Sequence, residues 1–316
     1  MSIPPPLPTA RAYPGPAHAV WMTLGVLGVQ VAVGMVIGFV SVFSAGLAGK
    51  GMPTSSTLAP AAILATNLVA FAVVLAWAAR ANRGQGREVW CGGRAGPAAW
   101  VAAVVAGSGA TILISVGGNF MLWLLPLPKA LLELFGRLAD LEANPVVGVL
   151  ATIVVPAIAE EALFRGYILR GLLDHIRPWP AIALSTLLFT VLHLNPWQVP
   201  VGVLLGLLCG WVYLRTRSLP LCILLHGVNN TIAVFAARLP FTVAGFNDGS
   251  TTGVAHPGWF DALGVALLLA GLGLFAVLTR RLMAPPPLPA AVSNPLLLPV
   301  LAAEDAVGTS EPPGER

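Results

Sequence analysis

The chain has 316 residues, of which 57% are hydrophobic and only 9% are charged, and its mean hydropathy is +0.83. Soluble domains carry roughly 25% charged residues, so this composition excludes an ordinary water-soluble protein and indicates a chain embedded in membrane lipid. The 17 Lys and Arg outnumber the 13 Asp and Glu. In a membrane protein we expect that excess in cytoplasmic loops, and we predict no nucleic-acid partner.

Apolar runs of about 20 residues, the length that crosses a bilayer, recur along the chain. They predict an all-α, polytopic transmembrane bundle of about eight helices. Two runs, Ala181–His193 and Val199–Val212, are shorter than this, so we expect them to tilt little, to continue as polar helix outside the bilayer, or to form a re-entrant pair. The six clear spans are Ala19–Val42, Leu58–Trp77, Trp100–Leu125, Val146–Phe164, Leu219–Ala236 and Ala262–Leu278.

The bundle is expected to occupy residues 19–281, between two segments of different composition. Residues 1–18 are predicted to be a cytoplasmic, proline-rich N-terminal segment. Residues 282–316 are predicted to be a disordered tail, because they offer little apolar surface to bury. Basic residues concentrate in alternate loops in a pattern that predicts both termini to be cytoplasmic. The three cysteines show no C-x-x-C spacing and are expected to be free thiols: Cys91, Cys209 and Cys222.

Charged residues at the end of the fourth span form the first candidate site. Each ionisable residue at membrane depth costs roughly 2.5 to 3.5 kcal/mol on insertion scales and so indicates function. Adjacent Glu160 and Glu161 point about 100° apart on a helix, whereas Glu161 and Arg165 share a face at i, i+4 and can pair. Glu160 is thus left free. From this segment alone, a purely structural ion cluster is an equal alternative.

Two later spans supply further polar groups. A lone histidine such as His193 is more often a helix-packing hydrogen-bonding residue than a catalyst. However, the turn near residues 175–178 lies about midway between Glu160 and His193, so antiparallel helices would place the two at one depth. In the seventh span, His226 and Asn230 lie at i, i+4 on one helical face.

The motifs E-E-x-x-x-R, F-x-x-x-H and H-x-x-x-N occur in this order, beginning at Glu160, Phe189 and His226. Together they resemble the CAAX prenyl protease and bacteriocin-processing family, also called the type II CAAX endopeptidase or Abi family. The resemblance covers about residues 144–237, the family's core. It implies an eight-helix intramembrane protease with a cavity open to the cytosol, which cleaves a peptide or lipidated protein.

The resemblance also implies roles for the site residues. Glu160 would be the general base and His193 its partner in holding the water. His226 and Asn230 would form the pair that stabilises the oxyanion. Glu161 and Arg165 match supporting positions.

The same residues leave the chemistry open. A carboxylate can take a proton from water, and a protonated imidazole and an amide N–H can stabilise an oxyanion. Glu160, His193 and His226 also make a sufficient zinc set with an open fourth position. The absence of H-E-x-x-H and the poor zinc affinity of an asparagine such as Asn230 favour a metal-free site or a loosely held metal. Other open functions are a proton or cation transporter and a catalytically silent protein that binds lipidated peptides or acts as a scaffold.

Overall fold

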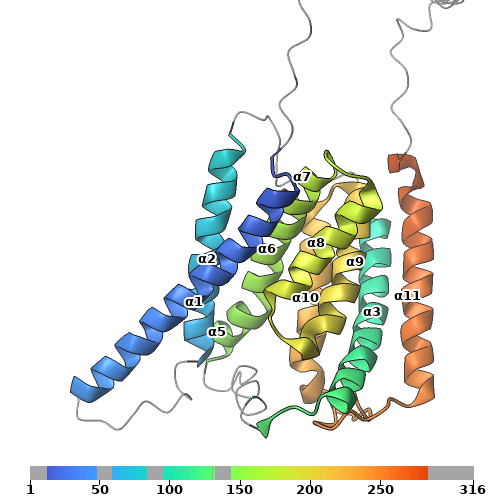
Figure 1. Cartoon of the computed structure of the whole chain (residues 1–316). Helices are drawn as coiled ribbons and strands as arrows, with labels where there is room; N and C mark the ends of the chain where they lie inside the picture. Colours follow the sequence, from blue (N-terminus) through green and yellow to red (C-terminus); the bar gives the residue numbers. More distant parts are fainter. Residues whose placement is uncertain (1–12, 48–58, 84–94, 130, 132–143, 284–316) are drawn as a thin grey trace, which may run out of the picture. The chain divides into compact units, whose positions relative to one another are not determined.

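The computed structural model describes residues 13–47, 59–83, 95–129, 131 and 144–283 (Figure 1). These residues form helices and connecting turns without any strand, which confirms the predicted all-α class. Within these described ranges, seven helices are long and apolar enough to cross a membrane, and an eighth apolar helix is shorter. The chain is therefore a multi-pass integral membrane protein. The tail from residue 284, most of the N-terminal segment and Cys91 lie outside the described residues.

Three helices precede the candidate site: α1 (Pro16–Leu47), α2 (Ala59–Ala81) and α3 (Pro97–Leu124). Each has a proline in its first turn. Proline costs no helical hydrogen bond there, because the first N–H groups of a helix have no partner within the helix. For α1 this places the start at Pro16 instead of the predicted Ala19. Helix α1 packs against α2 and α8, and α3 packs along α11.

The fourth span, Pro145–Leu172, alternates between two helical geometries. In chain order its segments are α5 (Pro145–Val149), the π-helix η1 (Leu150–Val154), α6 (Val155–Glu161), the π-helix η2 (Ala162–Leu169) and α7 (Arg170–Leu172). The span continues beyond the predicted end at Phe164. The predicted end of the span lay too early because charged Arg165 and Arg170 resemble the polar boundary of a span, but both side chains are buried.

The remaining helices are α8 (Pro178–Leu192), the 3₁₀ turn η3 (Pro196–Gln198), α9 (Val199–Thr216), α10 (Leu219–Phe235), the 3₁₀ turn η4 (Ala236–Arg238), α11 (Gly258–Thr279) and the 3₁₀ turn η5 (Arg280–Met283). Helix α8 is short, as predicted, and it ends before Leu194, whose φ of 46° is left-handed. The run beginning at Val199 continues as helix beyond its apolar stretch, one of the three outcomes expected for it. Together with η3 it forms a 21-residue span, because the helix continues past Val212 to Thr216.

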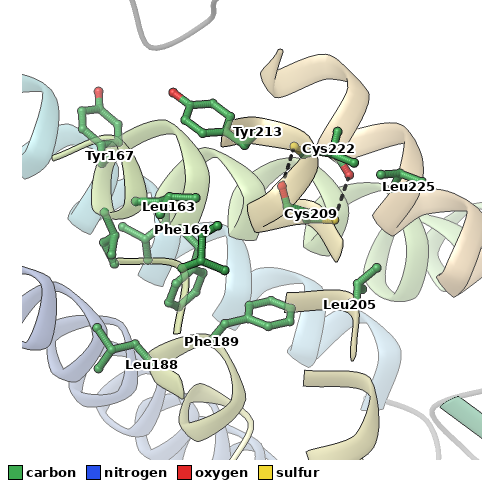
Figure 2. Packing of buried hydrophobic residues seen from close by; sticks show 14 of the residues in the cluster. Leu163, Phe164, Tyr167, Leu188, Phe189, Leu205, Cys209, Tyr213, Cys222 and Leu225 are labelled. Atoms are coloured by element: carbon green, nitrogen blue, oxygen red, sulfur yellow. Dashed lines mark hydrogen bonds between the residues drawn. The ribbon is translucent and has the colours of Figure 1, made fainter. Parts of the chain in front are cut away.

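Close packing positions α9 between its neighbours. Three glycines of α9 face α8: Gly202, Gly206 and Gly210. A Cβ atom on any of them would lie within 3 Å of an α8 side chain. The two helices therefore approach closely along this face. On its other side α9 meets α10, where the Cys209 thiol approaches the Cys222 carbonyl and the Cys222 thiol approaches that of Cys209 (Figure 2). Both thiols are free and buried, as predicted.

The connection between α10 and α11 folds onto the end of α3. Asn119 Nδ2 donates to the Gly245 carbonyl at 2.6 Å, and buried His256 lies 3.0 Å from Ser115 Oγ. The other ring nitrogen of His256, Nδ1, donates to Asp261 of α11 at 2.8 Å. These bonds hold the connection against both helices.

Candidate active site

The two candidate carboxylates lie at the last two positions of α6, between the π-helical segments η1 and η2. A π-helical turn contains an extra residue, is rare, and occurs frequently at functional sites. Both glutamates are buried: Glu160 is 9% exposed and Glu161 is fully buried. Burying two adjacent carboxylates is costly unless cationic or hydrogen-bonding groups compensate them, so their partners decide what the site can do.

Arg165 is the principal partner of Glu161, as the sequence predicted. Its Nη1 donates to Glu161 Oε1 at 2.6 Å, and its Nη2 donates to the Gly206 carbonyl of α9 at 3.0 Å. The guanidinium carbon lies 4.9 Å from the centre of the Phe189 ring. Arg165 therefore joins the fourth span to α8 and α9 while it neutralises Glu161.

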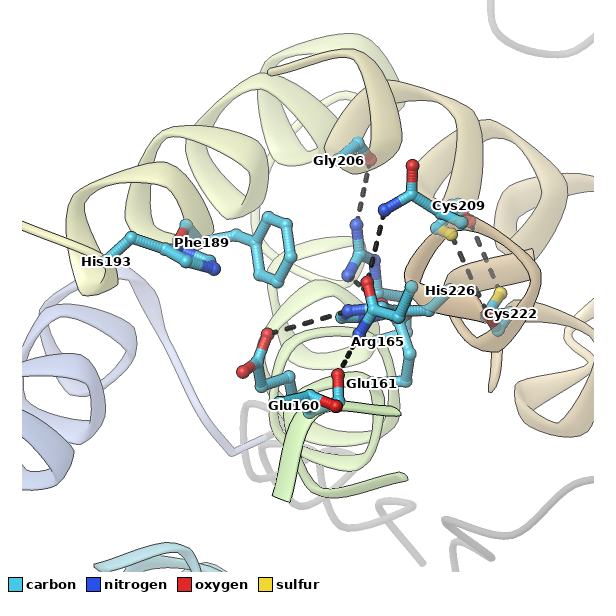
Figure 3. A network of polar contacts seen from close by, with 12 residues as sticks. Glu160, Glu161, Arg165, Phe189, His193, Gly206, Cys209, Cys222 and His226 are labelled. Atoms are coloured by element: carbon cyan, nitrogen blue, oxygen red, sulfur yellow. Dashed lines mark hydrogen bonds and ion pairs between the residues drawn. The ribbon is translucent and has the colours of Figure 1, made fainter. Parts of the chain in front are cut away.

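His226 of α10 lies between the two glutamates (Figure 3). Its Nδ1 donates to Glu161 Oε1 at 3.0 Å, because a carboxylate oxygen can only accept. Its Nε2 lies 4.0 Å from Glu160 Oε2. Glu161 therefore fixes both the orientation and the tautomer of the ring, with Nε2 directed toward Glu160.

Glu160 differs from its neighbour Glu161, whose Oε1 accepts from Arg165 and His226 and whose Oε2 is also buried without a described partner: Glu160 accepts no described hydrogen bond at either oxygen. Its Oε2 is inaccessible and has no hydrogen-bond partner among the described residues. The Arg165–Glu161 pair is present, and the role of Glu160 as the free carboxylate stays a prediction.

His193 lies at the C-terminal end of α8 and is partly exposed. Its Nδ1 donates to the Phe189 carbonyl at 2.9 Å, which leaves Nε2 as the acceptor nitrogen of a neutral ring. The Phe189 ring lies between the two histidines, with its centre 5.2 Å from that of His193 and 5.8 Å from that of His226. Among the described contacts, His193 makes no hydrogen bond or ion pair with Glu160.

Asn230 has a different set of partners. Its Nδ2 donates to the Thr152 carbonyl in η1 at 3.1 Å, and its Oδ1 accepts from Asn229. Asn229 in turn accepts from Thr111 of α3 at 3.2 Å. Asn230 thus anchors α10 to the fourth span, and one of its two amide N–H groups is occupied.

Residues 142–232 match the protein family described as type II CAAX prenyl endopeptidase Rce1-like. The match contains all three sequence motifs, from Glu160 to Asn230. Over these residues the chain is similar to the Rce1-like family of CAAX proteases. No curated protein and no solved structure matches the chain. Helices α1, α2, α3 and α11 lie outside the Rce1-like region.

Within the Rce1-like region, four of the six predicted site residues contact one another in one cluster: Glu160, Glu161, Arg165 and His226. His193 and Asn230 bond instead to nearby backbone carbonyls. The sequence interpretation missed Asn229 and Thr111. A polar residue beside Asn230 in an apolar span could have indicated Asn229, whereas Thr111 gave no local signal.

The predicted zinc set of the Rce1-like region is not assembled. In the part of the chain that the structure describes, no three His, Cys, Asp or Glu side chains are grouped to hold one metal ion. His226 Nδ1 is occupied by Glu161, and His193 makes no described hydrogen bond or ion pair with Glu160. The residues as arranged do not fit a three-ligand zinc site.

Proposed function

We propose that this protein is an intramembrane endopeptidase of the CAAX type, in which Glu160 activates water for attack on a peptide bond. The observation that carries the proposal is the buried Glu160 carboxylate, whose Oε2 has no hydrogen-bond partner in the described structure and faces the oriented ring of His226. The match of residues 142–232 to the Rce1-like family supports a protease.

The spacing of Glu160 and His226 suits a bridging water. Their facing atoms are 4.0 Å apart, too far for a direct hydrogen bond but close enough for one water to bond to both. Glu160 would accept a proton from this water as its oxygen attacks the peptide carbonyl. The same proton would then pass to the leaving amine as the C–N bond breaks.

The other residues have supporting tasks in this mechanism. Glu161 holds the His226 ring by its Nδ1, and Arg165 neutralises Glu161. A protonated His226 would present an N–H on Nε2 to the developing oxyanion. One amide N–H of Asn230 donates to the Thr152 carbonyl, and its second N–H would also donate to the oxyanion. His193 Nε2 would accept a hydrogen bond from the water.

An apolar groove next to the cluster supports a lipidated or membrane-embedded peptide as substrate. The groove lies between the fourth span and α10 and has a volume of about 430 Å³. Its walls include Ala157, one turn before Glu160, and Gly227, directly after His226. A hydrocarbon group held there would place the adjoining peptide near Glu160. We also propose, from the loop charges, that both termini are cytoplasmic.

The test uses the purified full chain in detergent with a farnesylated peptide reporter and the same peptide without the lipid. We expect cleavage, and faster cleavage of the farnesylated form. Activity should persist after exhaustive chelation, because the residues do not form a metal set; activity lost to a chelator and restored by zinc would show that the site rearranges around metal. Proton or cation flux in liposomes without any cleavage would overturn the proposal in favour of a transporter.

A further inference from the structure

A second apolar groove is lined by residues of α3, α8, α9 and α11. It has a volume of about 340 Å³, within the roughly 300 to 1,000 Å³ of small-molecule sites. Its walls carry no charged group and include Trp179, Leu204, Leu207, Trp211, Leu268 and Leu272. Such a wall suits a hydrocarbon chain.

A cation lies at the end of this groove. Arg215 follows Trp211 by one turn of α9, and its guanidinium carbon is 5.2 Å from the centre of the Trp211 ring. Its Nε donates to Thr279 Oγ1 at 2.8 Å, and its Nη2 donates to the Ala276 carbonyl at 2.9 Å. Both acceptors belong to α11, so the guanidinium spans the gap between α9 and α11 just beyond the groove.

Arg215 keeps donors for a ligand. A guanidinium has five N–H groups, and its Nη1 makes no hydrogen bond among the described residues. Arg215 is only partly buried. Its charge also has no carboxylate partner in the described part of the chain.

The groove reaches the end of the bundle that carries most of the described basic residues. Exposed arginines precede α8, follow α9 and follow α11: Arg177, Arg217 and Arg280. We have proposed that this end is cytoplasmic, where anionic lipids give the membrane surface a negative potential. Tryptophans such as exposed Trp179 are enriched at the headgroup level of membranes.

We infer that this groove binds an anionic phospholipid, with an acyl chain along the leucines of α9 and α11 and the phosphate on Arg215. The apolar wall alone would accept the chain of any phospholipid. Arg215 adds selection for net negative charge, and one arginine near a membrane surface favours an anionic lipid about five-fold. The site contains none of the residues of the proposed protease.

The test is native mass spectrometry of the full chain, purified in detergent and incubated with equal amounts of phosphatidylglycerol and phosphatidylcholine. We expect one retained phosphatidylglycerol, preferred about five-fold. Arg215→Gln should abolish the preference but keep a bound lipid. Leu272→Trp should fill the groove and lose the lipid. Leu269→Trp is the matched control, because Leu269 is 64% exposed on the same helix and does not line the groove.

A second readout avoids dependence on folded variants. Phosphatidylglycerol with a photoreactive acyl chain should cross-link in the wild-type protein to peptides that contain Leu207 or Leu272. Equal retention of the two lipids by wild type, retention by Leu272→Trp as strong as by Leu269→Trp, or cross-links confined to other helices would overturn the inference. None of these measurements depends on peptide cleavage, so they stand apart from the test of the protease.

Discussion

Glu160 and Glu161 are adjacent in sequence but differ in their surroundings. Glu161 is fully buried and accepts from two cationic or potentially cationic side chains, Arg165 and His226. Each glutamate has one inaccessible oxygen without a described partner, but Glu160 accepts no described hydrogen bond at either oxygen. Since adjacent positions on a helix point about 100° apart, the two carboxylates have separate tasks: Glu161 organises the cluster and Glu160 is available for chemistry.

The Glu161→Gln variant tests the organising task. It removes the counter-charge of buried Arg165, and breaking a buried ion pair by removing one partner costs roughly 3 to 5 kcal/mol. We expect a clearly lowered Tm in detergent and poor expression. Glu160→Gln is the matched control and should keep a Tm close to that of wild type. Equal Tm values for the two variants would contradict the assignment.

At this scale the sequence predicted contacts that are local and missed those that are not. Glu161 and Arg165 are one turn apart, so helical geometry alone predicts their pairing. The bond between His226 and Glu161 joins positions 65 residues apart and depends on how α10 packs against the fourth span. No spacing rule supplies that packing. The bond between His256 and Ser115, which are 141 residues apart, was missed for the same reason.

Among the elements, the fourth span and α10 carry five of the six site residues, and α9 contacts the cluster through the Gly206 carbonyl. The sequence predicted a helix in the fourth span from its apolar residues, but it gave no sign of the two π-helical segments, because no residue type encodes them. The glycines of α9 recur every four residues, a spacing that permits close helix contact in membranes. The Gly206 carbonyl also receives Arg165, so the contact between α8 and α9 is coupled to the cluster.

Gly202→Ala tests this contact. A Cβ at Gly202 would lie 2.9 Å from the backbone Cα of Thr190, so α8 would have to shift near its end at His193. Overpacking of this kind costs typically 1 to 3 kcal/mol, and we expect a lower Tm together with reduced turnover. Gly273→Ala is the control, because Gly273 is exposed on α11 and a Cβ added there would meet no described atom beyond its own helix backbone within 4 Å. Its expected effect is a stabilisation of roughly 0.5 to 1 kcal/mol. The close-packing account fails if both variants melt alike.

For the whole molecule, composition predicted a membrane protein and the apolar runs predicted about eight helices, because a chain that crosses lipid needs long apolar helices. Orientation is a further prediction that rests on loop charges alone. Cys91, which lies outside the described residues, is predicted to be in a cytoplasmic loop, whereas Cys209 and Cys222 are buried.

A membrane-impermeant maleimide should therefore label the protein at Cys91 in inside-out vesicles and leave it unlabelled in intact cells. Cys91→Ser should remove the signal. Labelling in intact cells would reverse the orientation and place the basic end of the bundle on the outer face.

The most direct test of the central claim is the turnover of purified Glu160→Gln on the farnesylated reporter, measured per folded molecule beside wild type. The substitution keeps the shape of the side chain and removes the proton acceptor. We predict a fall in turnover of about 10² to 10⁴, as expected for loss of a general base, with the Tm preserved. Wild-type turnover by Glu160→Gln would contradict the account.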